Sequence, residues 1–140
     1  EKCLIVSSTG PEKRYLKQLA EGFDNIQFTG DINDQELQNL IGNAVATIYI
    51  PKDEDFGMSP VESMAAGKPV IGVKEGGMLE TVIHEKTGWL IPSNPSLENI
   101  IQAVGEATPE KTLSMRIACE EQAKNFRTEI FEKKMRALIG

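Results

Sequence analysis

The chain has 140 residues, the length of one domain, and 40% of them are hydrophobic, which is enough to form a buried core. Its formal net charge of −6 disfavours a polyanionic partner such as nucleic acid. It contains no run of 18 apolar residues that could span a membrane, and its single histidine excludes a histidine-rich metal site. The two cysteines, Cys3 and Cys119, lie far apart and predict reduced, buried thiols in a cytosolic protein.

Short apolar runs alternate with helical patterns along the chain. We predict strands at residues 3–6, 26–28, 45–50, 69–73 and 89–91. We predict helices at residues 11–22, 34–44, 59–67, 78–83, 96–106 (starting at Ser96 or at Asn94), 109–125 (after a Thr108 cap) and 130–139. Nearly all-apolar strands that alternate with helices indicate the α/β class, a doubly wound, Rossmann-like parallel sheet with flanking helices. We expect residues 1–140 to form a single domain, and the start at Glu1 without methionine suggests an internal fragment of a longer protein.

Two helix starts fit the capping box, in which a side chain at the helix start and one three residues later each bond the other's backbone N–H. Asn33 and Glu36 form the first such pair, and Ser59 and Glu62 form the second. The second pair places Pro60 at the first helical position, where its missing N–H costs nothing.

In a doubly wound sheet, ligands bind beyond the carboxyl ends of the strands. We predict four loops at that edge, facing one crevice: residues 7–10, 29–32, 52–59 and 74–77. The basic residues nearest to it in the sequence are Lys52, Lys68 and Lys74. We expect no metal to hold a diphosphate, so helix dipoles and basic side chains would have to meet its charge.

Two glutamates with seven residues between them mark the loop after the third strand. Glu54 lies in the loop itself and Glu62 in the first turn of the next helix. Between them, Gly57 lets backbone N–H groups approach a bound anion. Carboxylates accept hydrogen bonds from hydroxyls, so the layout fits a sugar joined through a diphosphate to a nucleoside. Each glutamate also has a plainer explanation, Glu54 as part of a solvated acidic loop and Glu62 as part of a capping box.

Other sequence features are better explained by structure than by chemistry. The chain has no Gly-x-Gly-x-x-Gly and no Gly-Lys-Ser/Thr, which disfavours nicotinamide or flavin dinucleotides and excludes a P-loop. His84 lies at the end of a short helix, where we expect it to cap carbonyl groups. Trp89 begins a strand, and we expect it to pack in the core.

The run KDEDFGMSPVESMAAGKPVI at residues 52–71 strongly resembles the signature of retaining glycosyltransferases of the GT-B class, the group 1 glycosyl transferases. The segments FTGD at 28–31, EGGMLETV at 75–82 and KTGWLI at 86–91 fit the same family. The resemblance covers residues 3–105 in order, and it is closest to the sucrose-synthase-like and mannosyltransferase-like members.

The resemblance implies one half of a GT-B fold, the C-terminal, donor-binding half of a hexosyltransferase that retains anomeric configuration without a metal. Glu54 matches the catalytic-site glutamate that contacts donor-sugar hydroxyls, and Glu62 matches the glutamate that holds the ribose. The family's contacts to sugar and diphosphate match Phe56, Gly57, Met58, Ser59, Pro60 and Val61. The loop whose backbone reads the base matches residues 29–32, and in particular Gly30, Asp31 and Ile32.

The chain also departs from the family. In the family, the donor-binding half begins with a strand, a Gly-Arg pair and a helix that carries a lysine. This arginine and this lysine bind the diphosphate. Nothing in this sequence matches them. The acceptor-binding domain is absent too, so these 140 residues alone are expected to bind donor weakly and not to catalyse transfer.

The resemblance also implies the partners of the whole enzyme. They are a nucleotide-sugar donor, with GDP-mannose slightly preferred over UDP-hexoses, and an N-terminal domain that binds a glycan or lipid-linked acceptor. No further cofactor is expected. The resemblance implies a cytoplasmic location. Association with the inner face of a membrane would be made through the missing N-terminal domain.

Two other functions stay open. A non-catalytic nucleotide- or sugar-binding subunit that completes its site with a partner chain would carry the same motifs, and the coding sequence upstream of Glu1 distinguishes it from an enzyme half. A signalling domain of flavodoxin-like topology is disfavoured, because it needs acidic residues after the first strand, where this chain has Ser7-Ser8-Thr9-Gly10.

Overall fold

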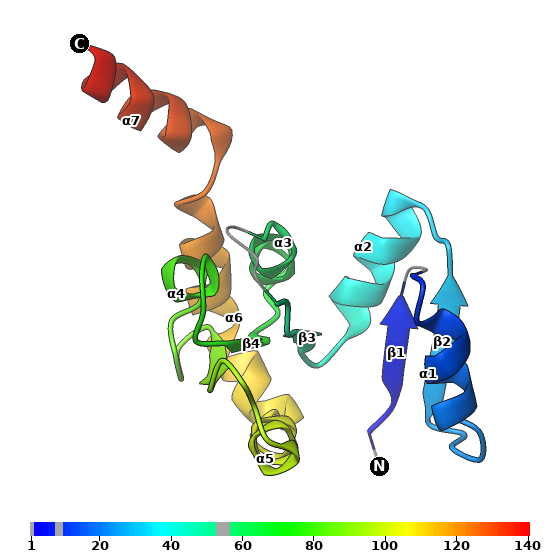
Figure 1. Ribbon diagram of the computed structural model, residues 1–140. Coiled ribbons are helices and arrows are strands. Elements are labelled where there is room, and N and C mark those ends of the chain that lie inside the picture. Colours follow the sequence, from blue (N-terminus) through cyan, green and yellow to red (C-terminus); the bar gives the residue numbers. More distant parts are fainter. Residues whose placement is uncertain (1, 8–9, 53–56) are drawn as a thin grey trace. The chain divides into compact units, whose positions relative to one another are not determined.

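A computed structural model of the chain describes residues 2–7, 10–52 and 57–140 (Figure 1). The chain divides into two compact units, residues 1–40 and residues 41–140. The described strands form two parallel ladders, β1-β2 and β3-β4-β5, where the sequence predicted one sheet. The strands of each ladder are parallel and are separated by helices, as the α/β prediction requires.

The first unit holds β1 (Leu4–Ser7), α1 (Lys13–Leu19), β2 (Ile26–Gly30) and most of α2 (Asp34–Asn43). The predicted capping box at the start of α2 is confirmed. The side-chain oxygen of Asn33 accepts a hydrogen bond from the Glu36 N–H at 2.9 Å, and the Asn33 N–H donates to the Glu36 carboxylate at 2.9 Å. No described residue of this unit is fully buried. Cys3 is exposed, so the prediction that it is buried is wrong: it lies directly before β1, in a unit without a fully buried described residue.

The second unit holds the other strands and helices. They are β3 (Thr47–Tyr49), α3 (Ser59–Ala65), β4 (Val70–Val73), α4 (Met78–Thr81), β5 (Gly88–Ile91), α5 (Leu97–Glu106), α6 (Pro109–Lys124) and α7 (Thr128–Ile139). β4 lies in the middle of the ladder and every one of its residues is buried. This is the pattern expected for a parallel strand covered on both faces, and the apolar runs in the sequence predicted it.

The core of the second unit forms around β4. Met64 of α3, Ile71 of β4 and Trp89 of β5 are each at most 2% exposed, and Met115 and Cys119 of α6 pack with them. Burial raises the pKa of the Cys119 thiol to about 11, so this cysteine is the buried, protonated thiol that the sequence predicted. Trp89 also packs as predicted, and its indole N–H donates to the Glu106 carboxylate at 3.0 Å.

The helix α3 begins differently from the prediction. Ser59 is its first helical residue and Pro60 its second, while the N-cap is Met58, which has helical backbone angles (φ −78°, ψ −24°) and makes no side-chain cap. A capping box needs the serine itself at the N-cap in an extended conformation. Because the helical conformation starts one residue earlier, Ser59 and Glu62 do not form the predicted box.

The C-terminal end of α3 reverses the chain through Gly67. The Lys68 N–H donates to the Ser63 carbonyl at 3.0 Å and the Gly67 N–H donates to the Met64 carbonyl at 2.9 Å. This is a Schellman motif, and its left-handed residue is Gly67, with φ of 73°. It places Lys68 before β4, at the amino end of the strand. The prediction that Lys68 lies near the ligand edge is therefore wrong.

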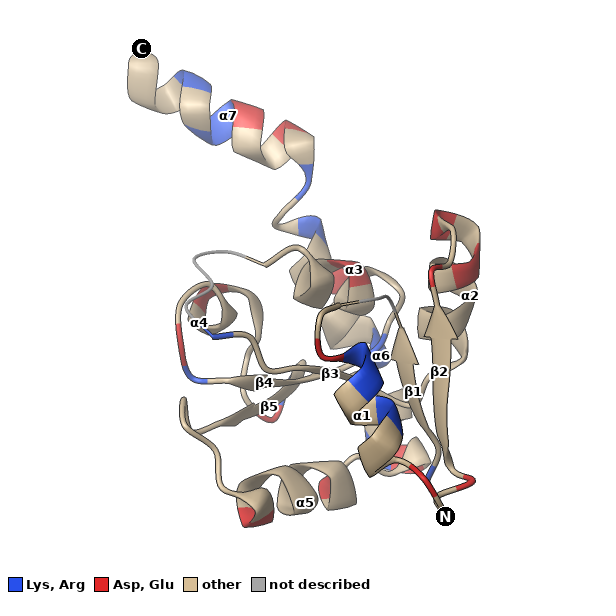
Figure 2. Ribbon diagram, turned by 45° about the vertical axis from the view of Figure 1, so that its right-hand side comes forward, with Lys and Arg blue, Asp and Glu red and all other residues tan. Residues whose placement is uncertain are grey.

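The helices at the C-terminal end of the chain begin close to where the sequence placed them. The Ser96 hydroxyl accepts from the Asn99 N–H at 3.2 Å at the start of α5, and the Thr108 hydroxyl accepts from the Lys111 N–H at 3.2 Å at the start of α6. α7 carries both acidic and basic residues (Figure 2) and none of its residues is buried. Within the described ranges, no helix is long and apolar enough to cross a membrane.

Removing the hydroxyl should cost different amounts of unfolding free energy at the helix that begins with Ser59-Pro60 and at the one that begins after Thr108. Thr108→Ala removes a cap and should lower the free energy of unfolding by about 1 kcal/mol, whereas Ser59→Ala removes a hydroxyl that caps nothing and should cost less than about 0.5 kcal/mol. Urea denaturation followed by the fluorescence of Trp89, the one tryptophan of the chain, measures both. Equal losses for the two variants would show that Ser59 does cap its helix.

Candidate functional site

The segments that follow β3 and β4 leave the sheet at the same edge, because these strands are parallel neighbours with Tyr49 opposite Gly72. Gly57, Met58 and α3 follow β3, and residues 74–77 and α4 follow β4. The two helices contact each other. Two of the four predicted loops therefore come together within the second unit. Residues 7–10 and 29–32 belong to the first unit, and a crevice common to all four loops stays a prediction.

Gly57 lies against the side chain of Tyr49, the last residue of β3. A Cβ atom added to Gly57 would lie 2.9 Å from Cε1 and 3.1 Å from Oη of that ring, closer than real side chains approach. Only glycine therefore lets the loop follow its path beside the strand. The sequence indicated Gly57 because glycine lets backbone N–H groups approach an anion, but it did not indicate Tyr49. A tyrosine at the end of the strongest predicted strand could have marked this contact.

The start of α3 presents unpaired backbone donors. The Glu62 N–H donates to the Met58 carbonyl at 2.9 Å, but among the described residues no acceptor is found for the N–H groups of Ser59 and Val61. Pro60 between them has no N–H. The N-terminus of a helix carries partial positive charge as well as these unpaired donors, and both favour a bound anion.

Glu62 lies in the first turn of α3 with an exposed side chain. Its carboxylate has no hydrogen-bond or ion-pair partner among the described residues. The structure therefore does not support the structural explanation of Glu62, a capping box with Ser59. The carboxylate is left able to accept hydrogen bonds from ligand hydroxyls.

The helix that carries Glu62 is fixed to the sheet below it. The hydroxyls of Thr47 on β3 and Ser63 on α3 are 2.7 Å apart, and the Ser63 hydroxyl also donates to the Lys68 carbonyl at 3.3 Å. Val61 and Met64 of the same helix are buried in the core. These contacts set the position of Glu62 relative to β3, and the sequence did not single out Thr47 or Ser63 for this role.

The second loop of this edge turns at the glycine pair that the sequence indicated. Gly76 has a positive φ of 50°, and Gly77 is the N-cap of α4 and accepts a hydrogen bond from the Thr81 hydroxyl at 3.0 Å. The Met78 side chain lies over Gly72 of β4, and its terminal methyl would have to move to admit a Cβ atom there. The exposed Lys74 supplies a basic side chain directly after β4.

In the first unit, the predicted base-reading loop lies at the end of β2. Gly30 has a positive φ of 73°, Asp31 is exposed and Ile32 is half-buried. The ammonium of Lys13 lies 3.6 Å from the place where a Cβ of Gly30 would be. Sequence reasoning missed Lys13, because it sits among the many charged residues of α1 (Figure 2).

A hollow of about 520 Å³ lies along α1 but contains none of the predicted site residues. Its lining is Gly10, Pro11, Lys13, Arg14, Lys17, Gln18 and Glu21. It follows one face of a single helix and is open to solvent, so it does not have the form of an enclosed ligand site.

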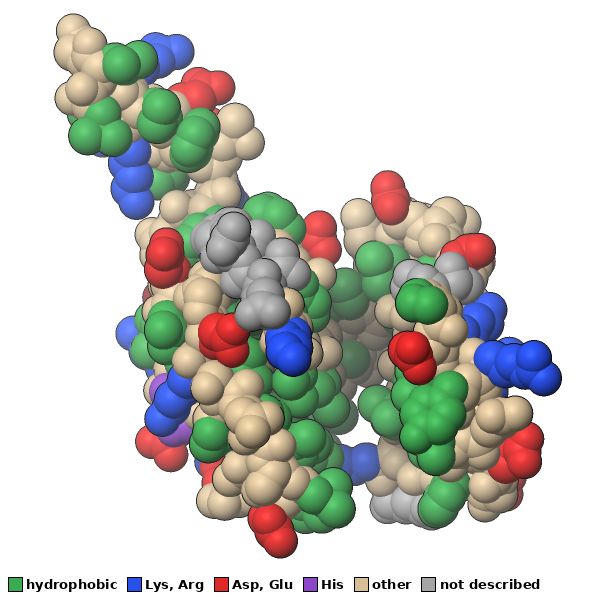
Figure 3. All heavy atoms as spheres, viewed as in Figure 1, with side chains coloured by type: hydrophobic (Ala, Val, Ile, Leu, Met, Phe, Trp, Pro, Cys, Tyr) green, Lys and Arg blue, Asp and Glu red, His purple; other side chains and the backbone are tan. Residues whose placement is uncertain are grey.

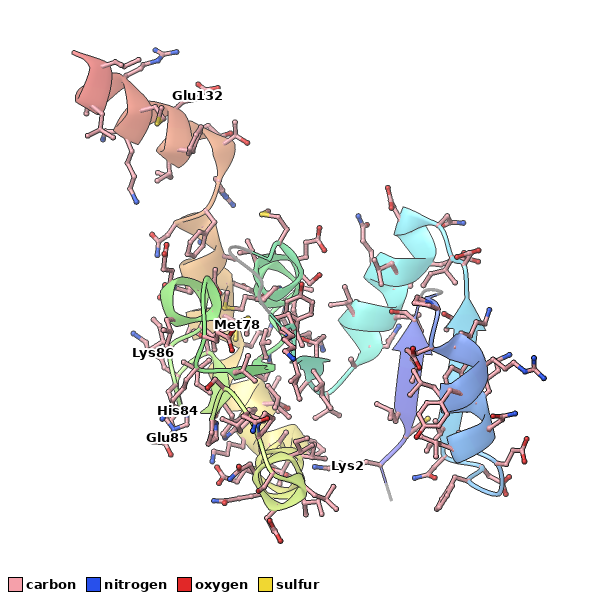
Figure 4. The ribbon with its side chains drawn as sticks, viewed as in Figure 1. Lys2, Met78, His84, Glu85, Lys86 and Glu132 are labelled. Carbon is pink, nitrogen blue, oxygen red and sulfur yellow. The ribbon has the colours of Figure 1, made fainter. Side chains whose placement is uncertain are left out.

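His84 has the structural role that the sequence predicted, with the opposite hydrogen-bond direction. Its Nδ1 accepts a hydrogen bond from the Leu90 N–H at 3.0 Å, so it pairs a backbone donor instead of capping carbonyls. The turn around it (Figure 4) contains Glu85, with φ of 61°, and is closed by the Thr87 hydroxyl, which accepts from the Ile83 N–H at 2.8 Å. We therefore do not count His84 among the candidate site residues.

Two predicted site residues, Glu54 and Phe56, lie outside the described residues, and their roles stay predictions. The roles of the other predicted site residues also stay predictions, although the structure brings Gly57, Met58 and the start of α3 to one edge. Within the described part of the chain there is no cluster of three or more His, Cys, Asp or Glu side chains that could hold a metal ion.

Comparison with known proteins decides the family. Residues 2–126 match the family model described as glycosyl transferases group 1. The chain belongs to this family. This confirms the resemblance found in the sequence, which rested on the segment after β3.

The relatives of this group 1 glycosyl transferase are longer proteins. It is 45% identical over 83 residues to alpha-1,3/1,6-mannosyltransferase ALG2 of Dictyostelium discoideum, covering 59% of this chain and 19% of that protein. It is 33% identical over 117 residues to the protein of the same name in Schizosaccharomyces pombe, covering 82% of this chain and 23% of that protein. The chain thus spans about a fifth of the length of these relatives.

A solved structure supports the fold prediction. Sucrose-phosphate synthase from Thermosynechococcus elongatus matches with a TM-score of 0.82 and 27% identity, over 98% of this chain and 37% of that chain. The Rossmann-like α/β fold, of the kind that forms one half of a GT-B glycosyltransferase, is therefore confirmed.

The close approach of Gly57 to Tyr49 predicts that this position tolerates no side chain. Gly57→Ala should push the loop away from β3 and weaken nucleoside diphosphate binding to the intact transferase about tenfold, or about 1.4 kcal/mol, as measured by isothermal titration calorimetry. Gly105→Ala is the matched control, because nothing lies within 4 Å of the added Cβ in α5, and its affinity should be unchanged. Equal affinity of both variants would place the nucleotide away from Gly57.

Proposed function

We propose that this chain is the donor-binding half of a retaining hexosyltransferase that moves mannose from a nucleotide sugar to a glycan or lipid-linked acceptor. The observation that carries the proposal is the start of α3, which has no side-chain cap among the described residues, where Glu62 of the first turn has no partner there either and Gly57 precedes the N-cap Met58. In a group 1 glycosyl transferase, these groups meet the two needs of a nucleotide sugar, which are donors for its diphosphate and acceptors for its hydroxyls.

The diphosphate is the leaving group, and its negative charge grows as the bond to the sugar breaks. We propose that the N–H groups of Ser59 and Val61 and the positive end of the α3 dipole stabilise this charge, assisted by Lys74 after β4. Oriented donors of this kind need no metal, so we propose a metal-independent transfer. The loop at Gly57 would bring further backbone N–H groups toward the same anion.

The two glutamates take different parts of the donor in this proposal. Glu62, at the start of α3, accepts hydrogen bonds from the ribose hydroxyls. Glu54, at the other end of the segment, acts at the donor sugar near the reacting carbon, where positive charge develops in the transition state. Neither is proposed as a general acid. Phe56 and Met58 complete the walls of the donor site between them, and the buried Pro60 supports the first turn of α3 from below.

We propose mannose as the transferred sugar because two relatives, at 45% and 33% identity, are named alpha-1,3/1,6-mannosyltransferases. The base would be read by the loop of Gly30, Asp31 and Ile32, largely through backbone groups. GDP-mannose is the donor that we expect, ahead of UDP-hexoses.

The acceptor would bind to a separate domain of the intact protein, since the chain spans about a fifth of its relatives. An enzyme is favoured over a non-catalytic binding subunit, because a relative aligned over 82% of this chain is named as an enzyme. We propose that the intact protein works on the cytoplasmic side of a membrane and that contact with the membrane is made through the acceptor-binding part.

A donor titration tests the proposed function. GDP-mannose, UDP-glucose and UDP-N-acetylglucosamine are each titrated against the intact protein, and transfer to acceptor is followed with and without a chelator. We expect GDP-mannose to bind at least about tenfold more tightly than the others, a difference of about 1.4 kcal/mol, and transfer to survive chelation. No difference among the three donors would overturn the mannose assignment, and the absence of binding to any of them would overturn the donor-binding function.

A second experiment tests the role of Glu62. Glu62→Gln should weaken GDP binding to the intact protein about tenfold, because an amide is a poorer acceptor for hydroxyls than a carboxylate. It should change the free energy of unfolding by less than about 1 kcal/mol, the size of a helix-dipole effect, since no capping box is lost.

Glu110→Gln is the matched control for this test, because Glu110 is an exposed glutamate in the first turn of α6. Its GDP affinity should equal that of the unaltered protein. A 2′,3′-dideoxy GDP removes the hydroxyls, and the unaltered protein and Glu62→Gln should bind it equally. If Glu62→Gln binds GDP as tightly as the unaltered protein does, Glu62 does not hold the ribose.

A further inference from the structure

The helix α4 is a single turn that has little stability of its own. It comprises four residues, Met78–Thr81, and isolated helices this short are not stable in water. It follows the loop of residues 74–77, which lies at the edge of the candidate site, and it contacts α3. The position of that loop therefore depends on what holds α4 against the rest of the second unit.

The two ends of α4 have different needs. At its start, the Thr81 hydroxyl donates to the Gly77 carbonyl at 3.0 Å, and the side chain of Met78 is buried. At its end, the backbone leaves the helical conformation at Val82, which is extended with φ of −100° and ψ of 128°. The last carbonyl groups of a helix have no partner within the helix, so those of Glu80 and Thr81 need a donor from elsewhere.

Gln122 of α6 supplies this donor. Its side-chain amide donates to the Thr81 carbonyl at 3.0 Å and to the Glu80 carbonyl at 3.5 Å. Among the described residues, no other hydrogen bond reaches these two carbonyls. The amide oxygen of Gln122 accepts a hydrogen bond from the Asn125 side chain at 3.2 Å, which directs the NH₂ group toward α4. The single turn is thereby tied to the long helix α6.

The contact between α4 and α6 is polar but uncharged. Charged side chains are spread over the surface of the second unit (Figure 3), whereas Gln122 is a half-buried neutral amide. The same helix α6 packs against α3, where Arg116 lies against Gly67. One helix therefore fixes both α3 and α4, the two helices that begin at the edge of the candidate site.

We propose that Gln122 is a positioning residue of the transferase, which holds α4 and, through it, residues 74–77 in the place needed for transfer from the donor. This inference rests on the proposed function, because the loop matters for transfer only if the donor binds at this edge. Lys74, proposed above to assist the diphosphate, belongs to the loop, and a misplacement of about 1 Å can lower a rate about 100-fold. Gln122 acts through the carbonyl groups of α4 and not on the donor itself.

Two variants of the intact protein test this inference. Gln122→Met keeps the length of the side chain and removes the hydrogen-bond donor, whereas Gln122→Lys keeps a donor that can reach the same carbonyls. We expect Gln122→Met to lower kcat for sugar transfer about tenfold, and Gln122→Lys to remain within about threefold of the unaltered protein. The Val82 N–H, which donates to the Met78 carbonyl at 3.0 Å, should exchange with solvent about tenfold faster in Gln122→Met.

Gln102→Met is the matched control. Gln102 is an exposed glutamine whose amide donates to the Glu106 carboxylate of the same helix at 3.3 Å, and it forms no hydrogen bond with α4. Both methionine variants should lower the urea midpoint by less than about 0.5 M, but only Gln122→Met should lower kcat. A loss of stability alone leaves the kcat of the folded enzyme unchanged, so a fall in kcat reports the position of the loop.

The outcomes separate this inference from the proposed function. An unchanged Val82 exchange rate in Gln122→Met would show that Gln122 does not hold α4, and faster exchange with unchanged kcat would show that the hold does not serve transfer. Either result overturns the inference, and so does an equal fall in kcat for Gln122→Met and Gln102→Met. If the unaltered protein transfers sugar from no donor, the proposed function fails, whereas faster Val82 exchange would still show that Gln122 holds α4.

Discussion

The clamping of α3 between the sheet and α6 is the constraint on which the candidate site depends. The helix is tied to β3 through the Thr47 and Ser63 hydroxyls, and it buries Met64 against the core. On its other side it contacts α6, where the close approach of Gly67 to Arg116 leaves no room for a side chain. A short helix has little stability of its own, so these tertiary contacts hold its first turn, and Glu62 with it, in place.

The same close packing explains the glycines of the site. Gly57 passes the ring of Tyr49 and Gly72 lies under Met78, and at each position an added Cβ atom would force the neighbouring side chain to move. The loops after β3 and β4 are thereby drawn against the ends of their strands. Among the described residues, the N–H groups of Ser59 and Val61 at the start of α3 have no acceptor, and an anion would use groups of this kind.

The strands of the described residues differ in how far they are buried. β4 is buried along its whole length, whereas Ile48 of β3 and Ile5 of β1 are 44% exposed. β4 has a strand neighbour on each side, and among the described residues β3 and β1 have one each. The core of the second unit therefore forms around β4.

The sequence by itself determined the order of strands and helices, the family and the loop that carries the candidate site, because apolar periodicity and the motif at residues 52–71 are local properties. It also predicted the caps at Asn33 and Thr108, which depend on residues three apart. Only the tertiary structure decided that α3 begins at Ser59 without a capping box, that Lys68 lies at the amino end of β4, and that Cys3 is exposed. Each of these features depends on tertiary packing, which local sequence patterns do not encode.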